Sequence, residues 1–143
     1  MKITTTLSLL IASFGTLAIA TPNPEANAAS ALDIVANPKG VCQKKNPRVV
    51  KAVDLFCQRS GTKLTVPSLF AHTGVYLKPN PPHSPNKVYV WIDGTCSPAQ
   101  WVPQEVCQKQ FYQMCAAGGQ RGGAVVKYGK NGCQTWNILI KKP

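Results

Sequence analysis

The sequence predicts an α+β protein in which two helices pack on a small antiparallel sheet with a C-terminal hairpin, stapled by three disulfides. Two segments carry apolar residues at helical spacing, and others alternate apolar and polar residues as strands do. Six cysteines lie in this chain of 143 residues. The order helix, strand, helix and hairpin is typical of the α+β class.

Residues 1–20 have the properties of an export signal. Lys2 precedes an apolar stretch, and Ala18-Ile19-Ala20 forms a small-x-small cleavage box. We therefore expect a signal peptide, a secreted extracellular protein, and no integral membrane span in the mature chain. Removal of Lys2 with this segment lowers the net charge from +11 to +10.

Residues 21–38 are rich in Ala, Asn and Pro and lack a periodic apolar pattern, which predicts a flexible N-terminal arm or pro-segment. Residues 39–143 are then expected to form one domain. At about a hundred residues, such a domain has a small core, and disulfides add stability that packing alone does not supply.

All six cysteines lie in that domain. An even number in an exported chain predicts three disulfides, whose pairing the sequence leaves open. Their wide spacing does not suit a metal site, so neither a metal nor another cofactor is expected. We expect the disulfides to tie the helices to each other or to the sheet. The residues are Cys42, Cys57, Cys96, Cys107, Cys115 and Cys133.

The first helix is expected to begin at Pro47, with Asn46 as its cap, and to end near Gly61. Apolar residues at helical spacing form its buried face: Val49, Val50, Val53, Phe56 and Cys57. Its other side carries a basic stripe, which is typical of a solvated helix face and also suits an anionic partner: Lys44, Arg48, Lys51 and Arg59.

The second helix is expected from Pro103 to Ala117, with Gly118-Gly119 ending it. Its inward residues at helical spacing are Val106, Cys107, Phe111, Met114 and Cys115.

Strict alternation predicts a strand over residues 87–93. Its aliphatic face, which consists of Val88, Val90 and Ile92, is expected in the core, whereas Tyr89 and Trp91 lie on the opposite face.

Residues 123–128 and 134–141 are expected to pair as a hairpin around Lys130-Asn131-Gly132, because Asn-Gly tolerates the positive φ of tight turns. A shorter strand is expected around residues 64–66. Residues 68–86 contain four prolines and both histidines, which predicts a long surface loop.

Aromatic residues are the main candidates for binding a ligand. Tryptophan and tyrosine offer flat apolar faces for sugar rings or protein partners. The candidates are Tyr89, Trp91, Trp101 and Tyr112, whereas Trp136 alternates with Ile138 and Ile140 and is expected in the core.

No catalytic constellation is evident. The domain carries only Asp54, Asp93 and Glu105 as carboxylates, and it lacks a serine-nucleophile elbow and a phosphate-binding loop. A basic ribonuclease using His72, His83 and Glu105 is the enzymatic alternative. No catalytic residue is assigned, and nucleic acid is not the expected partner.

The last half of the chain contains the stretches CSPAQWVPQEVCQKQFYQMCAAGG (96–119) and YGKNGCQTWNI (128–138). They resemble small cysteine-rich secreted proteins of filamentous fungi, the pool from which effectors are drawn. Their helix and terminal hairpin also look like fungal glycan-binding secreted proteins and, more remotely, killer-toxin-like folds. The resemblance covers the last half of the chain. It implies an extracellular fungal protein that promotes host colonisation, and therefore virulence, by binding.

The sequence therefore predicts a secreted, non-enzymatic, effector-like protein that binds a host extracellular protein, a glycan or a cell-wall component. An alternative is a basic antimicrobial or killer-toxin-like protein acting on anionic microbial surfaces, which its positive charge would favour. The secreted ribonuclease is the other alternative.

Overall fold

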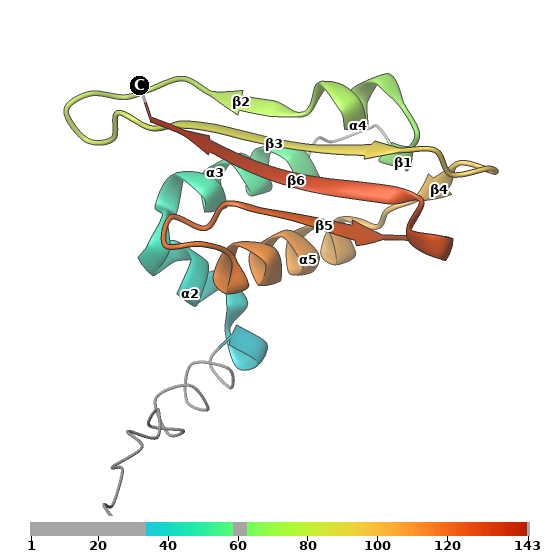
Figure 1. The fold of residues 1–143 in the computed structure, drawn as a ribbon, viewed down its shortest axis with the longest axis horizontal. Helices are drawn as coiled ribbons and strands as arrows, with labels where there is room; N and C mark the ends of the chain where they lie inside the picture. The colour runs from blue at the N-terminus through green and yellow to red at the C-terminus, as the bar shows by residue number, and fades with distance from the viewer. Residues whose placement is uncertain (1–33, 59–62, 143) are drawn as a thin grey trace, which may run out of the picture.

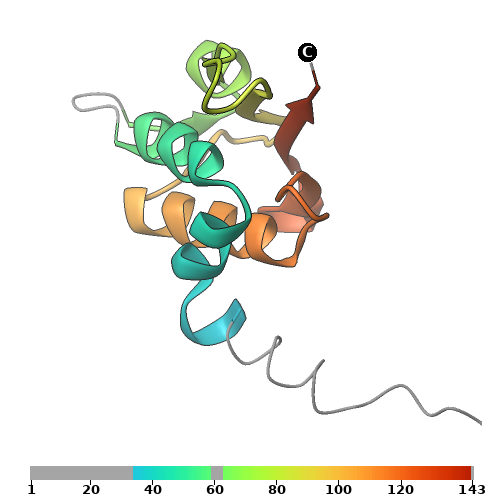
Figure 2. The same cartoon turned by 90° about the vertical axis from the view of Figure 1, so that its left-hand side faces the viewer.

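A four-stranded antiparallel sheet carries the main helices on one of its faces (Figures 1 and 2). This is the fold of a computed structural model, which describes residues 34–58 and 63–142. The expected signal peptide, residues 21–33 of the expected arm, and Arg59 lie outside the described residues. The α+β class predicted from the sequence is confirmed.

The order of strands in the sheet is β2-β3-β6-β5, and all neighbours are antiparallel. A separate two-stranded sheet pairs β1 with β4. The strands are β1 (Thr65–Val66), β2 (Val75–Leu77), β3 (Lys87–Gly94), β4 (Gln100–Trp101), β5 (Ala124–Tyr128) and β6 (Gln134–Lys141). The predicted strand over residues 87–93 and the C-terminal hairpin are confirmed.

The hairpin turn contains the short 3-10 helix η1 (Lys130–Gly132). Within it Asn131 has φ 57° and Gly132 has φ 68°, as the Asn-Gly prediction requires. Asparagine is one of the few residues besides glycine that adopts this conformation routinely.

The described helices are α2 (Pro38–Lys45), α3 (Pro47–Cys57), α4 (Leu69–Thr73) and α5 (Gln104–Ala117). The helices α3 and α5 are the two predicted ones. The Asn46 side chain caps α3 by accepting a hydrogen bond from the Arg48 backbone N–H at 3.1 Å. Pro103 precedes α5 as its N-cap without a side-chain hydrogen bond.

The core lies between this helical layer and the inner face of the sheet. Its sheet side consists of Val88, Val90, Ile92, Trp136 and Ile138, and its helix side includes Val49, Val53, Phe56 and Phe111. The Phe111 and Trp136 rings lie 4.7 Å apart between their centroids. Each large apolar side chain removed from water contributes about 1.5–3 kcal/mol, so these contacts are the main force holding the layers together.

Three disulfides link the elements: Cys42–Cys115, Cys57–Cys107 and Cys96–Cys133. The first two join α2 and α3 to α5, and the third joins the segment after β3 to the start of β6. The expectation that disulfides tie the helices to each other is therefore met, and none ties a helix to the sheet.

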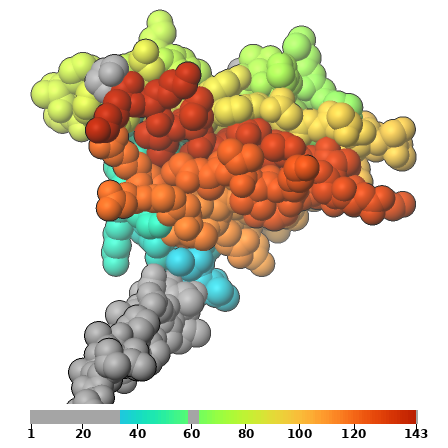
Figure 3. All heavy atoms as spheres, in the orientation of Figure 1, coloured from blue at the N-terminus to red at the C-terminus, as the bar shows by residue number. Residues whose placement is uncertain are grey.

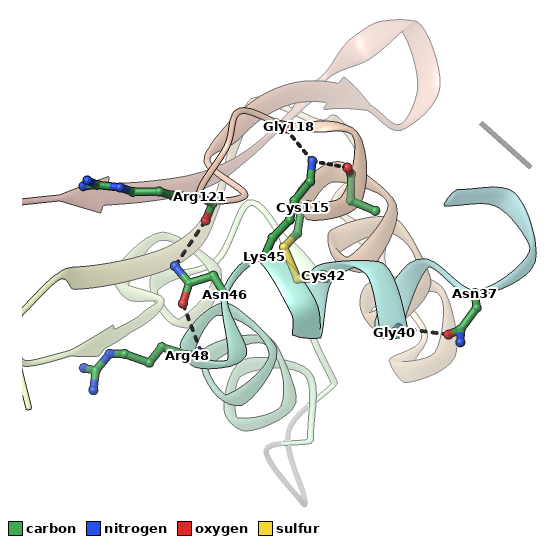
Figure 4. The surroundings of a disulfide bond; sticks show 10 residues. Asn37, Gly40, Cys42, Lys45, Asn46, Arg48, Cys115, Gly118 and Arg121 are labelled. Atoms are coloured by element: carbon green, nitrogen blue, oxygen red, sulfur yellow. Dashed lines mark hydrogen bonds between the residues drawn. A yellow bond between two sulfur atoms is a disulfide. The ribbon is translucent and has the colours of Figure 1, made fainter. Parts of the chain in front are cut away.

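Polar contacts complete the junction of α2, α3 and α5 (Figure 4). The Lys45 ammonium donates to the carbonyl oxygens of Ala116 and Gly118 at the C-terminal end of α5, where carbonyl groups lack partners within the helix. Asn46 is buried, and its Nδ2 donates to the Arg121 carbonyl at 3.1 Å. One asparagine thus connects the start of α3 to the loop after α5.

Three sequence-based expectations need correction. Val106 is 40% exposed and not inward, because it lies at the outer edge of the α5 stripe. Residues 68–86 are not one long loop, since they contain α4 and β2. The helix α2 was not predicted, because its mostly polar sequence has only Cys42 buried and gains its stability from the disulfide and the Lys45 contacts.

Substitution of Asn46 by Ala is expected to lower the free energy of unfolding by about 1–3 kcal/mol, because it removes both the cap and a buried hydrogen-bond donor. Asn46→Ser should cost less, since a serine hydroxyl can still accept from the Arg48 N–H. Urea denaturation of the oxidised protein measures both.

The matched control is Asn37→Ala, which removes the exposed cap of α2, where the side chain accepts from Gly40 N–H at 2.9 Å. We expect it to cost about 1 kcal/mol or less. An equal cost for the two alanine variants would contradict a role for Asn46 beyond capping.

Candidate functional site

The sheet face opposite the helices is the candidate site, and we call it the open face. It consists of the outward-pointing residues of the four strands: Tyr76 on β2; Lys87, Tyr89, Trp91 and Asp93 on β3; Thr135, Asn137, Leu139 and Lys141 on β6; and Val125 and Lys127 on β5. In Figure 3 the strands β3, β6 and β5 lie at the front, with no helix over them.

Alternation along β3 and β6 creates this face. Val88, Val90 and Ile92 point into the core, so their neighbours in the sequence must point outward. The sequence predicted this placement for Tyr89 and Trp91, and the structure brings them together on the open face.

An aromatic row runs along the open face and consists of Tyr76, Tyr89 and Trp91. The Tyr89 and Trp91 rings are stacked with centroids 4.3 Å apart, and Tyr76 meets Tyr89 edge-on at 6.2 Å. The Tyr89 hydroxyl donates to the Thr73 carbonyl at 2.9 Å, which fixes the ring in place. Tyr76 remains 48% exposed. The row therefore presents apolar surface whose geometry is already set.

Gly74 makes room for this row. It has φ 58° and ψ −159°, a backbone conformation essentially confined to glycine. A Cβ at this position would lie 2.5 Å from the Trp91 Cβ and would also collide with the Val90 carbonyl oxygen. The strand β2 can therefore approach β3 here only because residue 74 has no side chain.

A polar cluster stands at one end of the row, around Asp93. One oxygen of its carboxylate forms a 2.6 Å hydrogen bond with His72 Nδ1, and the other accepts from the Trp91 Nε1 at 2.6 Å. The Asn137 amide lies 3.4 Å from the same oxygen. The carboxylate is thus oriented by its neighbours, and the histidine side chain stays largely exposed.

A hollow lies toward the other end of the row. It measures about 230 Å³ and is lined by Tyr76, Lys87, Tyr89, Leu139 and Lys141. The ligand-binding set predicted from the sequence leaves out Tyr76, Leu139 and both lysines. The alternation of residues 134–141 gave a signal for Leu139 and Lys141, whereas β2 is too short for its pattern to be recognised.

Tyr112 is a correction to the predicted ligand-binding set. It is 5% exposed, and its hydroxyl donates to the Asp54 carboxylate, which also accepts from Gln108 Nε2 at 3.1 Å. Burial, followed by the contact with Asp54, raises the pKa of Tyr112 above that of a free tyrosine. The residue is part of the helix packing and offers no surface to a ligand.

Trp101 is exposed by 61%, but it does not join the aromatic row. It lies on β4 in the two-stranded sheet. There it lines a separate hollow of about 180 Å³ together with Tyr128 and Trp136. The side chains of Tyr128 and Trp136 belong to the inner face of the main sheet.

The predicted basic stripe is divided between elements. Lys44 belongs to α2, whereas Arg48 and Lys51 belong to α3. Lys44 and Lys51 are exposed, and the Arg48 guanidinium donates to the Lys78 carbonyl. Arg48 is therefore occupied by the protein, and the stripe is not one continuous surface on the described residues.

The two histidines of the ribonuclease alternative lie apart in the fold. His72 precedes β2 beside Asp93, whereas His83 lies in the turn between β2 and β3, at the opposite end of that strand pair. Glu105 is on α5. The geometry does not assemble these three residues into one site.

The described residues contain no group of three or more His, Cys, Asp or Glu side chains that could hold a metal ion. Among the helices of residues 34–58 and 63–142, none has the length and apolar character needed to cross a bilayer.

Comparisons of the chain with protein-family models, with curated proteins and with solved structures find no match.

Gly74→Ala should disrupt the aromatic row, because the new methyl group collides with Trp91 and the backbone conformation costs about 1–3 kcal/mol for a residue other than glycine. We expect a reduced near-UV circular dichroism signal and a lower unfolding midpoint. Gly119→Ala is the matched control, because a Cβ there meets nothing within 4 Å. An unchanged aromatic signal in Gly74→Ala would contradict this account of the row.

The free energy of unfolding is expected to fall as the pH rises above about 10. Unfolded tyrosines lose their protons there, while the raised pKa keeps Tyr112 neutral in the folded protein, so alkali favours the unfolded state. Tyr112→Phe should flatten this fall in urea titrations between pH 8 and about 11.

Tyr128→Phe provides the comparison, since burial alone raises the pKa of Tyr128. It should flatten the fall less than Tyr112→Phe does. If Tyr112→Phe kept the pH dependence of the unsubstituted protein, the assignment of Tyr112 to the helix packing would be wrong.

Proposed function

We propose that this is a secreted, non-enzymatic, effector-like protein that binds a carbohydrate of a host or a cell wall through the open face. One observation carries the proposal: the aromatic row stands on a sheet face that no described helix covers, with hydrogen-bonding side chains beside it.

The chemistry of this face suits a sugar. Sugar rings present apolar C–H faces that pack on aromatic rings, and hydroxyl groups that need donors and acceptors. Tyr76 supplies exposed ring surface, while Asp93 supplies a carboxylate that its neighbours orient next to Trp91. A site built on strands also holds its groups in fixed positions, which lowers the entropy cost of binding.

The cysteines support secretion. All three disulfides join segments far apart in the sequence, and the described chain has no free cysteine. Disulfides of this kind persist in oxidising compartments and are rare in the cytosol. Together with the export signal expected at residues 1–20, they favour an extracellular place of action.

The carboxylates favour binding over hydrolysis. Asp54 accepts hydrogen bonds from Gln108 and Tyr112 within the helix packing, and Glu105 lies on α5, away from the open face. Asp93 is the single carboxylate that the described strands place on that face. Acid–base hydrolysis of glycans generally requires a pair of carboxylates across the scissile bond.

Tyr76→Ala is expected to weaken binding to the recognised glycan about tenfold, equivalent to about 1.4 kcal/mol, because it removes the most exposed ring of the row. The measurement is a glycan array with the purified, oxidised protein, followed by calorimetry on the best ligand. Trp101→Ala is the control, since it removes an exposed tryptophan that lies outside the open face.

Equal weakening by Tyr76→Ala and Trp101→Ala would place binding elsewhere than on the open face. Absence of binding to every glycan on the array, at low and at high salt, would overturn the carbohydrate proposal and direct the search to protein partners.

A further inference from the structure

Two lysines face each other across the central strands of the open face. Lys87 and Lys141 are register partners at the end of the β3–β6 ladder. Both line the hollow of about 230 Å³, together with Tyr76, Tyr89 and Leu139. This hollow therefore combines two cations with two aromatic rings and one aliphatic side chain.

Within residues 34–58 and 63–142, no carboxylate forms an ion pair with either lysine. Like charges on directly paired strand positions destabilise a sheet. No carboxylate lines the hollow, and the ion pairs among the described residues are Lys39–Asp54 and His72–Asp93, neither of which involves these lysines. The hollow therefore offers positive charge beside aromatic rings. It is complementary to a ligand that carries an anionic group on an apolar framework.

Further positive charge lies at the same end of the sheet. Lys78 follows β2, next to the Leu77–Val88 pair, and Lys142 follows β6, and both are exposed. Asp93, the carboxylate of the open face, lies six positions along β3 from Lys87, about 20 Å away at the rise of a strand. The open face is thus electrically polarised along its length.

We propose that the hollow between Lys87 and Lys141 binds the carboxylate or sulfate group of an acidic sugar, whose ring packs on Tyr76 and Tyr89. The inference rests on the proposed function and names the class of glycan, an anionic polysaccharide. The polarity of the face would also fix the direction of the bound chain, because Asp93 repels acidic groups from the far end of the row.

The test compares the double variant Lys87→Gln/Lys141→Gln with Lys109→Gln. Lys109 is the control because it is an exposed lysine on α5, which lies outside the open face. The probes are polygalacturonate, which carries carboxylates, heparin, which carries sulfates, and a neutral chitin oligomer. Calorimetry gives Kd for each probe at about 0.05 M and about 0.3 M salt, which changes the screening of charges.

We expect the double variant to lose at least about tenfold in affinity for one acidic glycan, a change equivalent to about 1.4 kcal/mol. Lys109→Gln should change that affinity by less than about twofold, since it leaves the open face and its hollow intact. The glycan that is bound more tightly identifies the group as carboxylate or sulfate. Binding of the neutral oligomer, where it occurs, should be equal in the double variant and the unsubstituted protein.

Three results would overturn the inference. If Lys109→Gln lost as much affinity per removed charge as the double variant, the attraction would come from net charge alone. An unchanged affinity of the double variant for both acidic glycans would exclude the hollow. Binding to anionic phosphatidylserine vesicles that depends on Lys87 and Lys141, without acidic glycan binding, would identify a membrane-contacting surface.

These failures differ from failure of the proposed function. If the double variant behaves as the unsubstituted protein while Tyr76→Ala still weakens glycan binding, the open face binds a neutral sugar and only the acidic class is wrong. If neither variant affects any glycan, the carbohydrate proposal falls as well.

Discussion

The register between β3 and β6 is the constraint on which the rest of the structure depends. Eight consecutive residue pairs join these central strands, from Lys87–Lys141 to Gly94–Gln134. Because side chains alternate between the faces of a sheet, a slip of one residue would move Trp136 and Ile138 to the outside. The burial of these residues against the helices therefore fixes the register, and the register in turn fixes which side chains form the open face.

Disulfides and polar contacts among the helices stabilise the helical layer. The opposite face of the sheet takes no part in these contacts. Two disulfides bind α2 and α3 to α5, and Lys45 and Asn46 close the junction through backbone carbonyls. Asp54 adds a polar link between α3 and α5 through Tyr112 and Gln108. Stability is thus concentrated behind the sheet. The residues of the open face are held by the rigid strands beneath them and carry little of the core packing themselves.

The open face departs from what stability alone would favour. A lysine pair in register, an aromatic row and an oriented carboxylate stand on a surface that could have been covered with small polar residues. Local features of this kind are expected where a protein contacts a ligand, because binding uses groups that folding does not need. The net charge of +11 attracts anions to the whole molecule. On the open face, the lysine pair and the carboxylate lie at opposite ends, and this separation sets the orientation of a bound anionic ligand.

The sequence by itself determined the α+β class, the caps of α3, the Asn-Gly turn and the outward placement of Tyr89 and Trp91, because each of these depends on local periodicity or on the conformational preference of one residue. Tertiary structure decided the disulfide pairing, the helix α2 and the burial of Tyr112, which depend on contacts between distant segments. It also decided the site: Lys87 and Lys141 are 54 positions apart, and Tyr76 lies on a strand of only three residues, so strand pairing alone brings them to one hollow.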